Sequence, residues 1–372
     1  MHAKKHFPVY CYVLTVLLVL IIALASSHPV VRGMVLPVSL RTLFFLLIAC
    51  SLSILVPCNF ETLMRVFLCL GLAGTLIGVQ TLIGVACSKL GLELFGFAIK
   101  RTNYMYGLPQ VVSVFKNPNG LGFFLVFSLA SVIILFSLLK KEREKNKLLA
   151  AVFYAALAVQ LLTLVLTFSR AAFMALSLFV LCFIWFNRRR CCYTPPLALL
   201  SAAVLMSKQA LGKSGPAEIV SALFSGRIQL WGEGIKLFAQ SPLFGTGLGG
   251  WFALTGNSMS LHNTYLHVAV ELGLAGLVVY IAYIVLFMQG LHKAMSRATN
   301  PQRYALLSGL YSLSAGLLVH QFFESYLYQG LPLFLLALIP LHSLLREPGM
   351  LYRFREPAWK EQGGSWFYRR AS

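Results

Sequence analysis

Long apolar runs dominate this chain and predict its architecture. A membrane-spanning helix needs about 20 mostly apolar residues. The runs that meet or approach this length are 9–27, 34–56, 63–86, 120–139, 148–168, 171–187, 194–210, 264–289, 304–323 and 330–345. The seventh and the tenth are short. The pattern predicts an all-α, polytopic integral membrane protein with about ten transmembrane helices.

The basic residues between these runs predict the orientation. Lys and Arg are concentrated in the segments 140–147, 188–190 and 291–303 and in the tail after 345. The positive-inside rule places such segments in the cytoplasm. If 194–210 did not span the membrane, the basic loop 291–303 would face outward, against the rule. We therefore predict that 194–210 spans.

This orientation divides the chain into four parts. We expect a bundle of about seven helices at 1–210, an extracytoplasmic loop with short amphipathic helices at 211–263, about three helices at 264–345 and a basic, aromatic cytoplasmic tail at 346–372. The segment 87–119 is also expected outside. The protein is thus predicted in the cytoplasmic (inner) membrane, with its polar loop on the outer side.

Composition supports the membrane class and excludes other classes. The chain is 58% hydrophobic and only 11% charged, with a mean hydropathy of +0.78. A soluble domain does not have this composition. The net charge of +20 is explained by basic cytoplasmic loops, so we expect no nucleic-acid partner.

The acidic residues argue against metal chemistry. All 11 are Glu, and the chain contains no Asp. The outer-side Glu residues are scattered along the sequence at Glu93, Glu218, Glu233 and Glu324, whereas oxygen-ligand metal sites need several carboxylates together. The eight Cys residues include no Cys-x-x-Cys spacing. We expect a metal-independent mechanism without a cofactor.

Two outward arginines are candidates for binding an anion. Arg227 opens an amphipathic helix predicted at 227–240, at the edge of the apolar face that carries Trp231. Arg170 follows Ser169 at the outer turn between the fifth and sixth spans. Each is equally typical of an arginine that anchors a helix at the membrane interface. Guanidinium groups bind phosphate through paired hydrogen bonds, so an anionic phosphate is the natural partner of the two together.

His262 is the candidate base. It begins the eighth span, and a helix N-terminus disfavours the imidazolium ion, so a neutral imidazole can accept a proton. A histidine at a helix start is more often structural, but the preceding Gly-rich segment Gly245–Gly250 favours a functional role. That segment is either a backbone N–H nest for an anion or a simple turn.

Other polar residues are further candidates for contact with a sugar or a phosphate, or for a place beside the site. Asn263, His267 and Glu271 share a helix face at four-residue spacing, and His320 and Glu324 form a similar pair, for which packing is the simpler explanation. The remaining candidates lie in the second outer segment, which contains an Asn-Pro-Asn-Gly turn; they are Arg101, Lys116, Asn117 and Asn119.

Taken together, these motifs resemble the superfamily of O-antigen ligases and Wzy-type polysaccharide polymerases. The resemblance rests on Ser169-Arg170, Phe115-Lys116-Asn117-Pro118-Asn119, Arg227 with Trp231, Ser241-Pro242 with Gly245 and Gly247, and His262-Asn263-x-x-Leu266 with Glu271, Gly273 and Gly276. It is close over about 160–290. The chain departs from well-known ligases in having about ten predicted helices instead of about twelve.

The resemblance implies a membrane glycosyltransferase. Such proteins transfer a glycan from a polyprenyl-pyrophosphate carrier to a hydroxyl of a glycan, lipid or protein acceptor, without a metal, and ligases are thought to invert the anomeric centre. It gives His262 the role of activating the acceptor hydroxyl, and Arg170 and Arg227 the role of holding the pyrophosphate. Two alternatives stay open, a transporter or flippase for lipid-linked glycans and a non-catalytic envelope assembly subunit.

Overall fold

The computed structural model describes residues 60–92, 99–105, 108–115, 117–187, 224, 227–257 and 259–325. The spans predicted at 9–27, 34–56, 194–210 and 330–345 and the tail lie outside the described residues. The described helices are α3 (Phe60–Lys89), α4 (Pro118–Leu138), α5 (Lys140–Lys145), α6 (Lys147–Thr167), α7 (Arg170–Phe186), α10 (Arg227–Gln240), α11 (Gly250–Thr255), α12 (Thr264–Ser296) and α13 (Pro301–His320).

Six of these helices occupy predicted spans. By length and hydropathy, α3, α4, α6 and α12 are candidate membrane spans, and α7 is a shorter apolar helix. The structure is therefore mostly helical and of membrane type in the part that it describes. Four candidate spans there neither reach nor test the predicted total of ten.

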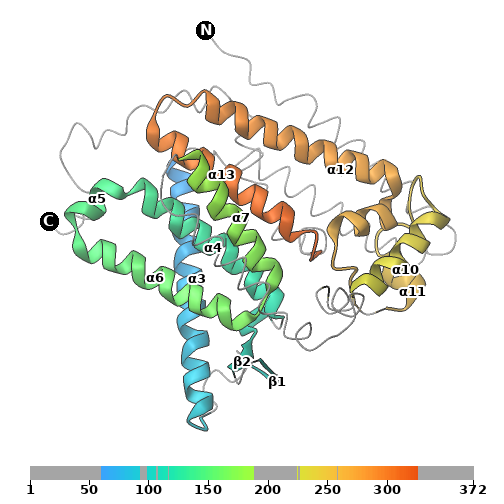
Figure 1. The fold of residues 1–372 in the computed structure, drawn as a ribbon, viewed down its shortest axis with the longest axis horizontal. Helices are drawn as coiled ribbons and strands as arrows, with labels where there is room; N and C mark the ends of the chain where they lie inside the picture. The colour runs from blue at the N-terminus through green and yellow to red at the C-terminus, as the bar shows by residue number, and fades with distance from the viewer. Residues whose placement is uncertain are drawn as a thin grey trace, which may run out of the picture.

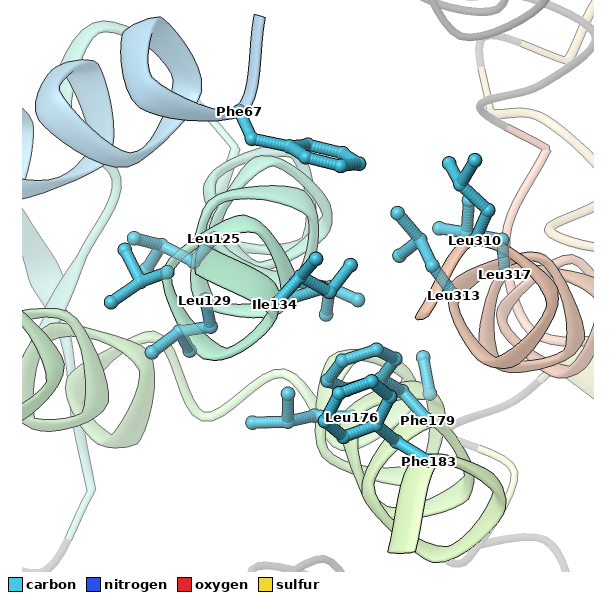
Figure 2. Packing of buried hydrophobic residues seen from close by; sticks show 14 of the residues in the cluster. Phe67, Leu125, Leu129, Ile134, Leu176, Phe179, Phe183, Leu310, Leu313 and Leu317 are labelled. Atoms are coloured by element: carbon cyan, nitrogen blue, oxygen red, sulfur yellow. The ribbon is translucent and has the colours of Figure 1, made fainter. Parts of the chain in front are cut away.

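One hydrophobic core joins α3, α4, α7 and α13 (Figure 2). Small residues allow close helix approach, which favours packing between membrane helices. Gly316 of α13 lies against the backbone carbonyl of Ala175 on α7, and Gly74 of α3 lies against the Ser128 side chain of α4. A Cβ atom at either glycine would overlap its neighbour. These contacts hold α13 against α7 and α3 against α4.

The segment before α4 contains an antiparallel hairpin. Strands β1 (Ile99–Met105) and β2 (Leu108–Val111) pair with Ile99 opposite Val111, and Gln110 Nε2 donates to the carbonyl of Thr167 at 3.1 Å. The expectation of an all-α chain is wrong for this segment. Strand formation here depends on pairing with a partner strand, which short-range periodicity does not reveal.

The described part of the polar loop, from α10 to residue 263, packs as a second, smaller unit beside the N-terminal end of α12 (Figure 1). Helix α10 has the bounds that its amphipathic pattern predicted. Its Leu237 packs with Trp251 of α11, Leu261 and Val270 in a separate apolar cluster. This cluster orients the segment that leads to His262.

A kink at Gly273 divides α12, where φ is 68° and ψ is −169°. The turn after α10 fills the break with backbone hydrogen bonds. Thr246 and Gly247 donate to the carbonyls of Val270 and Glu271 at 3.0 and 2.9 Å. In return, Leu274 and Ala275 donate to the carbonyls of Pro242 and Leu243 at 2.8 and 3.1 Å. The break therefore leaves none of these four backbone N–H groups without a partner, as a position near the membrane requires.

Candidate functional site

The start of α12 is tied to the segment that follows α13. The Thr264 amide donates to the Gln321 carbonyl at 2.9 Å, and the Thr264 hydroxyl donates to Gln321 Oε1 at 2.7 Å. The Asn263 amide donates to Ser325 Oγ at 3.1 Å. These bonds place His262 beside Glu324, although the two residues are 62 positions apart in the sequence.

Glu324 is the centre of the candidate site. Its Oε1 accepts hydrogen bonds from Arg227 Nη2 and from Asn119 Nδ2, both at 2.6 Å. Its Oε2 lies 2.9 Å from Nδ1 of His262. Glu324 is 3% exposed, Arg227 14% and His262 22%. One buried carboxylate thus joins a cation, an amide and a histidine, and the histidine is more exposed than the arginine.

The carboxylate determines which imidazole nitrogen is left to act as a base. With Nδ1 facing Glu324, the network assigns the proton to Nδ1, because a carboxylate can only accept. The lone pair then lies on Nε2. His262 also has a positive φ of 48°, an uncommon conformation for a residue with a side chain that is frequently found at functional sites. The geometry suits a histidine that takes up a proton.

Arg170 is the first residue of α7 and precedes its apolar stretch. The adjacent Ser169 packs against Gly122 in the first turns of α4, near Asn119. Burial and the positive charge of the nearby Arg227 lower the pKa of Arg170. Since arginine stays protonated in proteins, Arg170 adds a second positive charge to the site, where Arg227 is paired with Glu324.

The other predicted residues have several different roles. Trp231 Nε1 donates to the carbonyl of Leu261 at 2.9 Å, which supports the chain just before His262. Asn263 caps α12 by accepting from the Leu266 amide at 2.9 Å, and Asn117 caps α4. Lys116 and the side chain of Arg101 lie outside the described residues.

Two sequence interpretations are corrected by the structure. Helix α13 ends at His320, so His320 and Glu324 do not share a helix face. The buried His320 ring instead packs 5.0 Å from that of Phe123. The Gly-rich segment is not a free anion nest, because the amides of Thr246 and Gly247 donate to α12.

The predicted pair on α12 is confirmed, with His267 Nε2 3.2 Å from Glu271 Oε1. Both side chains are buried, and the His267 ring lies 5.9 Å from that of Phe252 on α11. The pair therefore belongs to the packing of α11 against α12.

Sequence reasoning underrated Glu324. The sequence predicts it only as one of several possible contact residues, whereas in the structure it contacts His262, Arg227 and Asn119 directly. The available signal was its position just beyond the outer end of a predicted span, where a buried charge needs a partner. Among the described residues, no group of three or more His, Cys or Glu side chains is arranged to hold a metal ion.

Comparison with known proteins agrees with the motifs. No curated protein matches the chain. Residues 153–281 match the family model described as O-antigen ligase. Arg170, Arg227 and His262 lie inside the matched segment, whereas Asn119 and Glu324 lie outside it. The resemblance read from the motifs is thereby confirmed over this segment, which is similar to the O-antigen ligase domain of the O-antigen ligase and Wzy superfamily.

Proposed function

We propose that this protein is a metal-independent membrane glycosyltransferase. It transfers a glycan from a polyprenyl-pyrophosphate carrier to an acceptor hydroxyl on the outer face of the cytoplasmic membrane, as an O-antigen ligase or surface polysaccharide polymerase. The observation that carries the proposal is the contact of one carboxylate, Glu324, with both His262 and Arg227. It places a candidate base next to a candidate phosphate ligand.

The first step is binding of the donor pyrophosphate by Arg170 and Arg227. The guanidinium of Arg227 has five N–H donors, and its hydrogen bond to Glu324 uses Nη2. The other N–H donors of the guanidinium can bind a phosphate while Arg227 stays paired with Glu324. The negative charge of the pyrophosphate is attracted to both guanidinium groups.

The second step is transfer. A sugar hydroxyl is a poor nucleophile until its proton is removed as the new bond forms. Nε2 of His262 takes this proton, the hydroxyl oxygen bonds to the anomeric carbon, and the bond from that carbon to the pyrophosphate oxygen breaks. The electron pair leaves with the polyprenyl pyrophosphate, and Arg170 and Arg227 stabilise its charge. Glu324 keeps His262 in the required tautomer and stabilises the imidazolium that forms.

The transporter alternative has less support. Transporters bind substrates at broken helices near the membrane midplane, and α12 is indeed broken at Gly273. However, the backbone of residues 242–247 fills that break. The contacts among His262, Glu324 and Arg227 lie away from that break, and a transporter does not need a base held by a carboxylate.

The test compares donor binding with transfer in the same purified variant. We expect His262→Ala and His262→Gln to bind the lipid-linked donor normally and to lose about 10²–10⁴-fold in turnover, the usual contribution of a positioned base. His292→Gln is the matched control, because His292 is exposed near the basic end of α12. Turnover of His262→Ala at the wild-type rate would show that the base lies elsewhere.

A further inference from the structure

The turn that fills the break in α12 is in direct backbone contact with it. A Cβ atom on Gly245 would overlap the backbone of Glu271, Leu272 and Gly273, and a Cβ atom on Gly273 would overlap the backbone of Leu243 and Phe244. Two glycines with positive φ thus allow backbone to touch backbone. The turn therefore lies at the same depth in the membrane as the kink.

Residue counting gives that level. Helix α12 has 33 residues, about 50 Å at 1.5 Å per residue, which exceeds the roughly 30 Å hydrocarbon core. The exposed Lys293 and Arg297 mark its cytoplasmic end. The residues from Gly273 to His292 number 292 − 273 + 1 = 20, which is one span. The kink consequently lies at the outer boundary of the hydrocarbon core, and deeper if the helix is tilted.

The tip of the turn is apolar and uncovered at this level. Leu243 is 62% exposed and Phe244 42% exposed. Leu274 and Val278, in the stretch of α12 that follows the kink, are 49% and 58% exposed, and the Leu243 carbonyl accepts from the Ala275 amide in that same stretch. The tip therefore continues the exposed apolar surface of a candidate membrane span.

We propose that Leu243 and Phe244 form a membrane anchor that inserts among the phospholipid acyl chains of the outer leaflet. The segment 241–247 is then a shallow re-entrant turn instead of part of an aqueous loop. It fixes the height of α10 and of the residues leading to His262 above the membrane. The anchor does not depend on the proposed glycan transfer.

A photo-crosslinking residue tests this anchor. Benzoylphenylalanine is placed at 243 or 244 of the full chain, and at 257 as the control, since Asn257 follows α11 in the polar part of the loop. The protein is reconstituted in phosphatidylethanolamine–phosphatidylglycerol nanodiscs without donor and irradiated. Its mass is then measured by intact-protein mass spectrometry. We expect a mass increase of one phospholipid at 243 and 244, at least tenfold more abundant than at 257.

Two results would overturn the proposal. Equal, low lipid capture at all three positions means that the turn lies in water. Crosslinks from 243 and 244 to peptides of this chain, found after digestion, mean that protein covers the tip. A variant that fails to reconstitute is replaced by the other tip position, because either one alone tests the contact.

Discussion

Replacing Glu324 with glutamine is a test that the site geometry makes specific. Glutamine keeps the size of the side chain but offers one acceptor oxygen and one NH₂ group. Arg227 and Asn119 both donate to Oε1 at 2.6 Å. The amide oxygen must therefore occupy the Oε1 position. In the reverse orientation the NH₂ group would face the N–H donors of both Arg227 and Asn119. The NH₂ group then faces Nδ1 of His262, 2.9 Å from the original Oε2.

The predicted consequence is the wrong imidazole tautomer. Nδ1 must accept from the NH₂ group, so the proton moves to Nε2, which can no longer take the acceptor's proton. The loss should approach the full value of a general base, about 10²–10⁴-fold in kcat, or roughly 3–5 kcal/mol of transition-state stabilisation. Donor affinity should be unchanged or higher, because Arg227 is no longer neutralised by a carboxylate.

The assay measures donor binding and glycan transfer in purified protein, with Glu233→Gln as the matched control. Glu233 is exposed on α10, so this control makes the same chemical change outside the site. Glu324→Ala sharpens the comparison, since alanine removes the three bonds but imposes no tautomer. Per folded molecule, it should retain more turnover than Glu324→Gln. The opposite order, or wild-type turnover in Glu324→Gln, would refute the positioning role of Glu324.

Three further predictions follow from the same geometry. Arg227→Lys should recover little of the transfer lost in Arg227→Ala, because an ammonium cannot reproduce a bidentate fork; donor affinity and turnover of both variants measure this, and full activity of either would reduce Arg227 to an anchor. Gly245→Ala should lower the unfolding temperature in detergent more than Gly256→Ala, since both have positive φ, costing roughly 1–3 kcal/mol, but only the former overlaps backbone. Transfer should survive a strong chelator in the purified assay, and a loss restored by added magnesium would contradict the metal-independent mechanism.

Much of the helical framework follows from the sequence because it depends on local pattern. The length of the apolar runs alone predicted six of the described helices, and the spacing of apolar residues predicted the bounds of α10. The prediction of His262, Arg170 and Arg227 as site residues rested on residue chemistry at helix starts, and the structure places His262 and Arg227 on one carboxylate.

Tertiary structure alone decided which residues meet. Glu324 lies 62 positions from His262 and 205 from Asn119, and no periodicity connects residues at such separations. The same is true of the β1–β2 hairpin and of the Pro242–Gly247 turn that fills the break in α12. Each depends on backbone groups finding partners from distant parts of the chain. The sequence therefore determined which helices form and which chemistry is available, whereas packing of α4, α10, α12 and α13 determined that this chemistry converges on Glu324.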